Sequence, residues 1–286
     1  MGRRGAFGAG IEWGRMSAVD ETALPPVFLH HGLFGYDAVG VGRFKWAYFQ
    51  GIDKALRRAG YRVCTTRVHP TGGVARRAGE LKGFIEEALS GMGLPADTRV
   101  LVVGHSMGGL DARYMVSKLG MEERVAAVLT VTCPHRGTPY ADWCVRHFGK
   151  RLGGFELMEM LGIDVQGVRD VTTEGCARFN EEVRDVPGVG YYSVSAAREW
   201  PRVAPWVLHS HRVVTEAEGA NDGLVSVKSS TWGTHLCTWR ADHFHTINKR
   251  YLFELRNRTG NIGPYYVRAV NEVCRRMTNQ CPGNDE

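Results

Sequence analysis

An apolar run that leads into a glycine–serine–glycine turn is the feature that most constrains this chain. Residues 100–103 are uniformly apolar, Gly104-His105-Ser106-Met107-Gly108 follows them, and residues 107–119 can form a helix. A sharp strand-to-helix turn holds a serine clear of the backbone, and small flanking residues let it close without clashes. The pattern alone recurs by chance in ordinary glycine-rich turns, but strand, turn and helix occur here in the required order. The segment therefore predicts a nucleophilic serine, Ser106.

Strand and helix candidates alternate along the first half of the chain. The expected strands are residues 27–30, 61–68, 100–103 and 125–131, and the expected helices are residues 48–59, 74–89 and 107–119. This alternation predicts an α/β fold with a mostly parallel central sheet, right-handed crossovers and flanking helices. Active sites in such folds lie at the carboxyl ends of the strands. Segments 31–35, 105–109 and 133–138 each follow a strand, so we expect them to share one site.

The length of the chain predicts one large domain. Its 286 residues, 43% of them hydrophobic, suit a single packed core over residues 25–286 after a flexible tail at 1–24. Residues from about 138 to 186 break the alternation and read as a helical insertion over the sheet. The insertion is either a set of core helices or a mobile lid.

Composition excludes several classes of protein. The net charge of +6 comes with no long lysine–arginine tract, so we expect no nucleic-acid partner, although a weak attraction to anionic lipid is compatible with it. The seven cysteines form no Cys-x-x-Cys pair, which disfavours a zinc site and a disulfide framework. We expect no metal and no cofactor. Residues 1–16 lack the apolar core of a signal peptide and no run reaches the roughly 18 apolar residues of a membrane helix, so an intracellular location is expected.

A serine nucleophile needs an acid and a base, and in this fold they follow it in the order acid, then histidine. Asp222 is the best acid, because Asn221-Asp222-Gly223-Leu224-Val225 predicts a tight loop that can hold a carboxylate at the rim of the sheet. Its rival, Asp242, directly precedes His243. Adjacent side chains of an extended chain point to opposite faces, so Asp242 is badly placed to bind that ring.

Three histidines come after Asp222 and could serve as the base. His243 is preferred because it precedes a helical segment expected at residues 247–256, and His245 and His235 are the alternatives. The oxyanion site is expected to use the backbone N–H of Met107 and a second N–H from residues 31–35, with Leu33 as the donor. The remaining polar residues near these motifs, His30, His31, His105 and Asp111, are interpreted as structural.

Five motifs in this order resemble those of a known enzyme family. They are His31-Gly32-Leu33-Phe34-Gly35-Tyr36-Asp37, the serine segment 104–114, Pro134-His135-Arg136-Gly137-Thr138, Asn221-Asp222-Gly223-Leu224-Val225 and Asp242-His243-Phe244-His245-Thr246-Ile247-Asn248. The chain resembles the bacterial true lipases of the pseudomonad and burkholderia type, and more closely their fungal and mitochondrial triacylglycerol lipase relatives, from about residue 25 to 251. The resemblance implies an α/β-hydrolase fold, a carboxylic-ester hydrolase, the triad Ser106, Asp222 and His243, and a lid after Thr138.

The chain departs from the bacterial relatives at two places. The resemblance implies a calcium ion held by an aspartate two residues after the catalytic histidine, a glutamine six after it, and an aspartate about twenty before the acid. Here these positions carry His245, Lys249 and the neighbourhood of Arg202. A protonated lysine has no lone pair to donate and calcium prefers oxygen ligands, so we expect this calcium site to be absent. The disulfide partner six residues after the acid is Lys228 here, so that bridge is expected to be missing too.

The expected function is therefore the hydrolysis of acylglycerols or related acyl esters through an acyl-enzyme. The substrate is a lipid or an acyl ester, and the lid could contact a lipid interface transiently. A phospholipase, a thioesterase or an esterase for small esters would use the same triad. A non-catalytic binding protein with this fold is the remaining alternative.

Overall fold

The fold is centred on one six-stranded, all-parallel sheet with the strand order β4-β1-β5-β6-β7-β8. The computed structural model describes residues 24–35, 38–41, 44–95, 97–150, 154–155, 160, 164–200, 202–249 and 260–279. The strands of the sheet are β1 (Val27–His30), β4 (Val63–Thr65), β5 (Val100–His105), β6 (Val125–Val131), β7 (Gly190–Ala196) and β8 (Thr234–Trp239). A separate antiparallel hairpin is formed by β2 (Ala38–Val41) and β3 (Phe44–Ala47).

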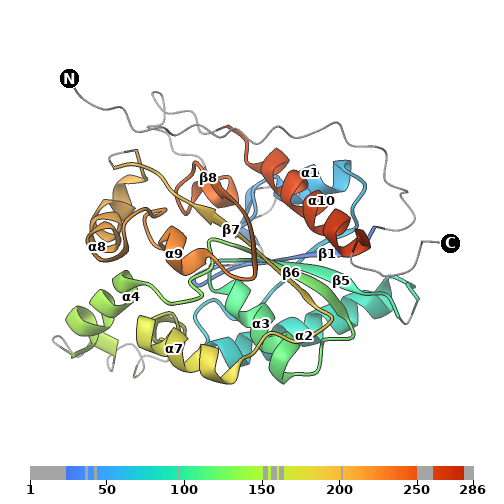
Figure 1. The fold of residues 1–286 in the computed structure, drawn as a ribbon, viewed down its shortest axis with the longest axis horizontal. Coiled ribbons are helices and arrows are strands. Elements are labelled where there is room, and N and C mark those ends of the chain that lie inside the picture. The colour runs from blue at the N-terminus through green and yellow to red at the C-terminus, as the bar shows by residue number, and fades with distance from the viewer. Residues whose placement is uncertain are drawn as a thin grey trace.

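Helices cover both faces of the sheet (Figure 1). One face carries α1 (Ile52–Arg58) and α10 (Gly263–Asn279), and the other carries α2 (Val74–Gly91) and α3 (Gly108–Lys118). Successive side chains of a strand point to opposite faces. Val27 and Leu29 of β1 accordingly pack in the core below α1 and α10, while Phe28 packs against α2 and α3.

Burial on both faces explains why the central strands are apolar throughout. All six residues of β5 are buried, and β1 on one side and β6 on the other share its hydrogen bonds. Strands covered by helices on both faces read as continuous apolar runs rather than as alternating ones. This is the physical reason why the central strands were recognisable in the sequence.

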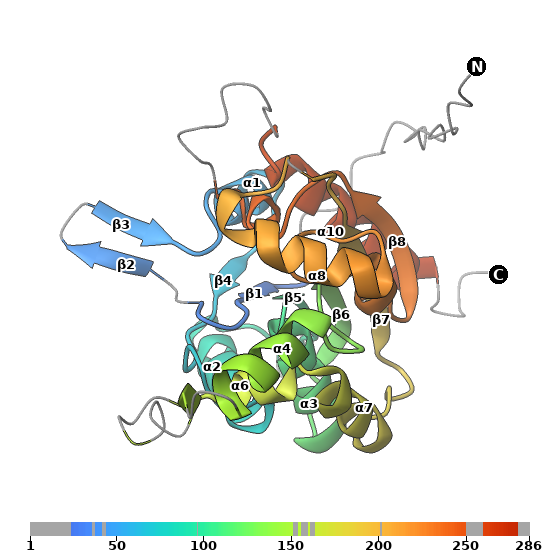
Figure 2. The same ribbon diagram turned by 90° about the vertical axis from the view of Figure 1, so that its left-hand side faces the viewer.

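The segment between β6 and β7 is helical wherever it is described. It contains α4 (Pro139–Cys144), the π-helix η1 (Val145–Lys150), α6 (Gln166–Asp170) and α7 (Thr173–Glu182). Figure 2 shows α4 in front of β5 and β6, and its Tyr140 and Trp143 rings pack against His209 of α8 (Leu208–Glu218). The predicted insertion is therefore helical over its described residues, and it lies over the sheet edge where β5 ends.

Several boundaries differ from the expected ones. The first helix begins at Ile52 instead of residue 48, and the strand expected at residues 61–68 is limited to Val63–Thr65. After His243 the chain forms only the 3-10 turn η3 (His245–Ile247), and Asn248 then takes a left-handed φ of 63°, so no α-helix starts at residue 247. Residues 250–256 of the expected helix lie outside the described residues. Residues 1–23 of the expected tail lie outside them too.

Several further elements were not expected from the sequence. They are the hairpin of β2 and β3, the strands β7 and β8, the 3-10 turn η2 (Pro205–Val207), and the helices α8, α9 (Val227–Ser230) and α10. Among the described helices, none is long and apolar enough to cross a membrane.

Candidate active site

Ser106 occupies a strained turn between β5 and α3. Its φ is 54°, in the left-handed region that residues with a side chain rarely adopt, and its N–H is bound to the Val131 carbonyl at 2.9 Å. A Cβ on Gly104 would lie 2.6 Å from the Gly108 oxygen, and one on Gly108 would lie 2.8 Å from the His30 and His31 oxygens. The turn therefore closes only with glycine at both positions, and the serine is held at the end of β5.

Asp222 and His243 form the acid–base contact that the sequence suggested. The His243 Nδ1 lies 2.7 Å from Asp222 Oδ2, and the His243 N–H also donates to the Asp222 carbonyl at 2.8 Å. The second carboxylate oxygen, Oδ1, accepts the N–H groups of Leu224 and Val225 at 2.9 and 2.7 Å. Asp222 is fully buried. A buried carboxylate that accepts several hydrogen bonds is fixed in place, and its negative charge stabilises an imidazolium on the partner ring.

The rival acid and the rival bases are bound elsewhere. Asp242 Oδ2 lies 2.7 Å from His245 Nδ1, and Asp242 Oδ1 accepts the N–H groups of Phe244 and His245. Burial raises the pKa of Asp242, but its hydrogen bonds and the charge of His245 outweigh burial and lower the pKa overall. His235 lies within β8 and its Nε2 contacts Ser195 Oγ at 3.0 Å. Of these groups, only His243 is paired with Asp222 in the described residues.

His105, the residue before the serine, packs against the His243 ring. The two ring centroids are 4.7 Å apart, and the His105 nitrogens contact Tyr48 Oη and Thr246 Oγ1, each at 2.8 Å. Burial, and then the positive charge that His243 can carry, lower the pKa of His105 well below its ordinary value. His105 is therefore a neutral, fixed support behind His243, in agreement with its interpretation as a structural residue.

The loop after β1 approaches the serine closely enough for an oxyanion site. A Cβ on Gly32 would lie 2.7 Å from the Cβ and 3.2 Å from the Oγ of Ser106. The Phe34 N–H is bound to the Pro70 carbonyl at 2.7 Å, and Phe34 has a φ of 56°. Within the described residues, the N–H groups of Leu33 and Met107 donate to no other group. These two donors are available to an oxygen that develops negative charge near Ser106.

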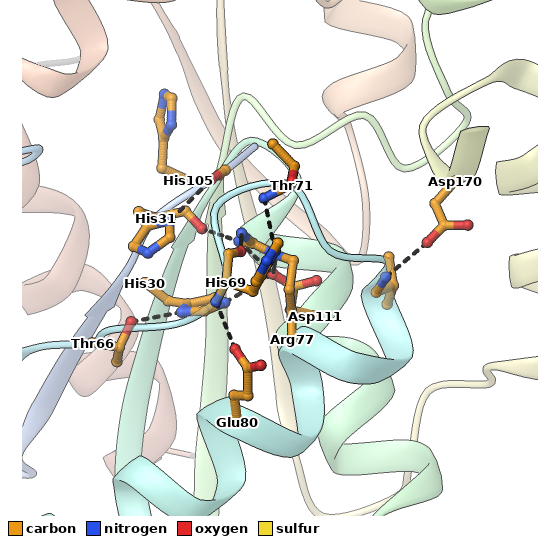
Figure 3. Close-up of polar contacts among 12 residues, drawn as sticks. His30, His31, Thr66, His69, Thr71, Arg77, Glu80, His105, Asp111 and Asp170 are labelled. Carbon is orange, nitrogen blue, oxygen red and sulfur yellow. Dashed lines mark hydrogen bonds and ion pairs between the residues drawn. The ribbon is translucent and has the colours of Figure 1, made fainter. Parts of the chain in front are cut away.

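A buried ion pair lies directly behind this loop (Figure 3). The Arg77 guanidinium bonds Asp111 Oδ2 at 2.8 Å, the His31 carbonyl at 2.6 Å and the His69 carbonyl at 2.7 Å. His30 Nε2 contacts the same Asp111 oxygen at 2.9 Å. Arg77 thus joins α2 to the two loops that carry the oxyanion donor and its support, residues 31–35 and 66–71.

Arg77 is the residue that the sequence analysis missed. A signal was present, because Arg77 shares one face of α2 with the buried residues Leu81 and Ile85, at helical spacing. A charged residue on an apolar helix face must find a buried partner. The partner, Asp111, lies on α3, and only the packing of α2 against α3 brings the two together.

The histidines that precede Gly32 are held neutral by their surroundings. Burial, and then the charges of His30 and Arg77, lower the pKa of His31 to about 3. Burial likewise lowers the pKa of His30, against the opposing contribution of Asp111. His31 Nδ1 lies 2.9 Å from the Gly32 oxygen, so the neutral ring stabilises the loop instead of taking part in proton transfer.

The positions that correspond to the bacterial calcium site do not suit a calcium ion. His245 is engaged with Asp242, and the Lys249 ammonium lies over the Phe244 ring, 5.5 Å from its centroid. Arg202 is exposed and pairs with Glu199 at 3.9 Å. Nitrogen bases and cations replace the oxygen ligands that calcium needs. In the described part of the chain, no three acidic, histidine or cysteine side chains are grouped so that they could hold a metal ion.

The sequence is similar to curated lipases from a yeast and from bacteria. The PGAP1-like alpha/beta domain family matches residues 72–185. Triacylglycerol lipase 2 of Saccharomyces cerevisiae is 30% identical over 210 residues, which are 70% of this chain and 62% of the yeast protein. The triacylglycerol lipase of Vibrio cholerae is 29% identical, with 78% of this chain and 79% of that protein covered. The triacylglycerol lipase of Pseudomonas fragi is 27% identical, with coverages of 78% and 87%.

Solved structures show the same fold at lower identity. The metagenomic carboxyl esterase MGS0156 superposes with a TM-score of 0.71 at 22% identity, covering 97% of this chain and 82% of that one. The Staphylococcus hyicus lipase has a TM-score of 0.70 at 18% identity, with 93% and 100% covered. The curated relatives support a triacylglycerol lipase-like α/β hydrolase, and the solved structures show the fold. The chain spans less than two thirds of the length of the yeast relative.

Proposed function

We propose that the protein is a serine carboxylic-ester hydrolase that uses Ser106, His243 and Asp222 as its catalytic triad. The observation that carries the proposal is the 2.7 Å contact between His243 and the buried Asp222, beside a serine held at a φ of 54°. The curated lipases and the esterase fold support the same class of reaction. Serine, acid and base follow one another in the chain order that this fold requires.

The reaction follows from the roles of these groups. His243 accepts the hydroxyl proton as Ser106 Oγ attacks the ester carbonyl carbon, and Asp222 stabilises the resulting imidazolium. The N–H groups of Leu33 and Met107 stabilise the oxyanion. His243 then donates its proton to the departing alcohol, which leaves an acyl-enzyme. Water, deprotonated by the same histidine, releases the carboxylic acid and restores the Ser106 hydroxyl.

Exposed apolar side chains near the site favour a lipid or long-chain acyl ester as the substrate. Phe34, next to Leu33, is 65% exposed, and Trp206 is 55% exposed. The Trp206 ring packs against Phe244, 5.7 Å between centroids, and Phe244 packs against His243 at 6.0 Å. Large exposed aromatic residues around a site are typical of surfaces that contact apolar ligands. The insertion from Pro139 to Glu182 is proposed to act as a lid, through which the protein contacts a lipid interface.

An intracellular location is proposed with this function. In the described part of the chain, the six cysteines at positions 64, 133, 144, 176, 237 and 274 are free thiols. Free thiols are typical of proteins kept in a reducing compartment.

The triad is tested with Ser106→Ala on a series of nitrophenyl esters of increasing chain length. The variant should lose at least about 10⁴-fold in kcat, because the nucleophile is gone and only the oxyanion site remains. Ser90→Ala, at an exposed serine of α2, is the matched control and should keep wild-type rates. A fluorophosphonate probe should label the wild type and the control but not Ser106→Ala. Near-wild-type turnover by Ser106→Ala would exclude this residue as the nucleophile.

The nitrophenyl esters, compared with acylglycerols, phospholipids and thioesters, separate the candidate substrates. A lipase should prefer long chains presented as micelles or emulsions over dissolved short chains. A phospholipid, a thioester or a small soluble ester hydrolysed faster than any acylglycerol would redirect the assignment while keeping the triad. A chain that neither hydrolyses an ester nor reacts with the probe would be a binding protein with this fold.

A further inference from the structure

Three loops meet behind the proposed acid and base. Arg198 lies on one of these loops and contacts the other two. The loop after β7 carries Arg198, whose N–H donates to the carbonyl of Asn221, the neighbour of Asp222, at 3.0 Å. Its carbonyl oxygen lies 2.8 Å from His211 Nε2 of α8. Its guanidinium reaches the loop of His243, with NH1 at 2.8 Å from His245 Nδ1. One residue therefore links the acid loop to the base loop.

Asp242 completes this connection from the other side. The side chain is fully buried and accepts the N–H groups of Phe244 and His245 at 3.0 Å each. Its second oxygen accepts the Ala204 N–H, at 2.9 Å, from the loop that follows Arg198. A carboxylate that binds several backbone N–H groups fixes the course of the loop that carries it. Here that loop includes His243, the residue next to Asp242.

The His245 imidazole lies between a carboxylate and a guanidinium. Its Nδ1 is 2.7 Å from Asp242 Oδ2 and 2.8 Å from Arg198 NH1. In one tautomer Nδ1 donates to Asp242, and in the other it accepts from Arg198. In both cases the opposite charges of Asp242 and Arg198 meet at the same ring nitrogen in a largely buried place, where their attraction is stronger than in water.

The positive charge beside the loop of His243 comes from a side chain of the protein. The family resemblance implies oxygen ligands and a calcium ion at this loop, and the residues present do not suit that ion. Arg198 supplies a fixed positive charge at the same loop. Guanidinium is planar, always protonated and able to bind two partners at once, which makes it well suited to this role.

We propose that Arg198 is a positioning residue, which together with Asp242 and His245 holds the loop of His243 against Asp222 without a metal ion. The kinetic part of this proposal rests on the proposed ester hydrolysis. Arg198 does not contact a reacting atom in the structure. It acts through the geometry of the Asp222–His243 pair, so its loss should alter turnover more than substrate binding.

The test compares Arg198→Met with the wild type in kcat, KM, melting temperature and the low-field NMR signal of the proton shared by His243 and Asp222. Arg198→Met should lower kcat by about 10- to 100-fold, the effect of removing a group that orients a site residue. Its KM should stay within about twofold, because the acyl site is untouched. The low-field signal should weaken or disappear. Arg198→Lys should restore part of kcat, since it keeps the charge but not the planar fork.

Arg202→Met is the matched control, because Arg202 lies on the same loop, is 49% exposed and pairs only weakly with Glu199, at 3.9 Å. It should leave all four quantities at wild-type values. Each protein is also measured in excess EDTA and in excess calcium, and neither should shift the melting temperature of the wild type or rescue Arg198→Met.

Two results would overturn the proposal. One is an Arg198→Met protein that keeps wild-type kcat and the low-field signal. The other is a wild type that loses both in EDTA and recovers them with calcium, which would assign the role to a metal ion. If Arg198→Met does not fold, Arg198→Gln, which keeps a donor without the charge, is subject to the same two outcomes. A wild type that cleaves no ester would refute only the proposed function, because melting temperature and the NMR signal still report on the loop.

Discussion

Single glycines decide how closely the backbone approaches Ser106. Gly104 and Gly108 let β5 turn into α3, and Gly32 lets the loop after β1 lie against the serine side chain. At each of these positions a methyl group would come within 2.8 Å of a neighbouring atom. These residues contribute no functional group, yet they determine where Ser106 and the proposed oxyanion donors lie.

Gly32→Ala should impair turnover without unfolding the protein. The new methyl would meet Ser106 Cβ at 2.7 Å and the His105 carbonyl at 3.0 Å, so the loop and its Leu33 donor must move away. Loss or misplacement of one oxyanion donor costs about 10²- to 10³-fold in kcat. We expect a decrease of this size, measured on the best nitrophenyl ester, with an unchanged circular dichroism spectrum.

Gly83→Ala is the control for that substitution. Gly83 lies inside α2 and a Cβ there meets no atom within 4 Å. Alanine in a helix interior should stabilise the protein by about 0.5–1 kcal/mol and leave kcat unchanged. Full activity of Gly32→Ala would show that the loop does not supply the oxyanion donor.

The helices α2 and α3 are joined by a buried ion pair, Arg77–Asp111, beneath the loop of residues 31–35. Arg77 and Asp111 are both fully buried, and Arg77 also holds the carbonyl groups of His31 and His69. Leu81, Ile85 and Met115, on the same two helices, belong to the apolar core between these helices and the sheet. The pair therefore transmits the packing of two helices to the loop beside Ser106.

Asp111→Asn should destabilise the protein strongly, because it leaves the Arg77 guanidinium buried without its counter-charge. The expected loss is about 3–5 kcal/mol in the free energy of unfolding, measured by urea denaturation. The double variant Arg77→Met/Asp111→Leu should recover much of this stability, since apolar replacements of a buried ion pair are often neutral. Its kcat should remain low, because the His31 carbonyl has lost its donor.

The exposed pair on the same helix provides the comparison. Arg76 contacts Glu80 at 3.1 Å with 54% of its side chain exposed. Arg76→Gln should change stability by no more than about 1 kcal/mol. Equal effects of Asp111→Asn and Arg76→Gln would mean that burial does not govern the contribution of the Arg77–Asp111 pair.

The molecule as a whole carries several buried histidines whose rings are held neutral. Burial lowers the pKa of the ring in each of four cases, His30, His31, His105 and His135. Several of them pack around the candidate site. Their rings bind carbonyl, hydroxyl and carboxylate groups, so they serve as polar members of the core.

These histidines predict a loss of stability in mild acid. A ring whose folded pKa lies below its unfolded value of about 6.5 takes up a proton more readily in the unfolded chain. The free energy of unfolding must then fall as the pH decreases below 6.5, by up to about 1.4 kcal/mol per pH unit for each such ring. For His31, with a pKa of about 3, this window extends down to about pH 3.

Urea unfolding at a series of pH values between 7.5 and 5 checks this prediction. The midpoint should shift to lower urea as the pH falls, and the shift should be smaller in His31→Gln, which removes one titrating ring. A midpoint that is constant over this range would show that the rings titrate in the folded protein as they do in the unfolded chain.

The apolar central strands and the order of the catalytic residues could be predicted from the sequence. The strands at residues 27–30 and 125–131 were predicted with the bounds that the structure shows, because both faces of them are covered and all positions but His30 and Thr130 are apolar. β7 and β8 were missed. β7 contains Ser193 and Ser195, whose buried hydroxyls bind Trp232 and His235, so it lacks the apolar pattern of the other strands. Such partners are supplied by distant segments and leave no local signal.

Sequence by itself determined the strand–turn–helix around Ser106, the order of the proposed serine, acid and base, and the resemblance to lipases. These depend on local backbone preferences and on short glycine patterns, which are read over a few residues. Only the tertiary structure decided that Asp222 rather than Asp242 meets His243, that Arg77 supports the oxyanion loop, and that Arg198 links the loops of acid and base. Each of these contacts joins residues more than twenty positions apart. They form only because parallel strands bring their carboxyl ends to one edge of the sheet, where the connecting loops must share space.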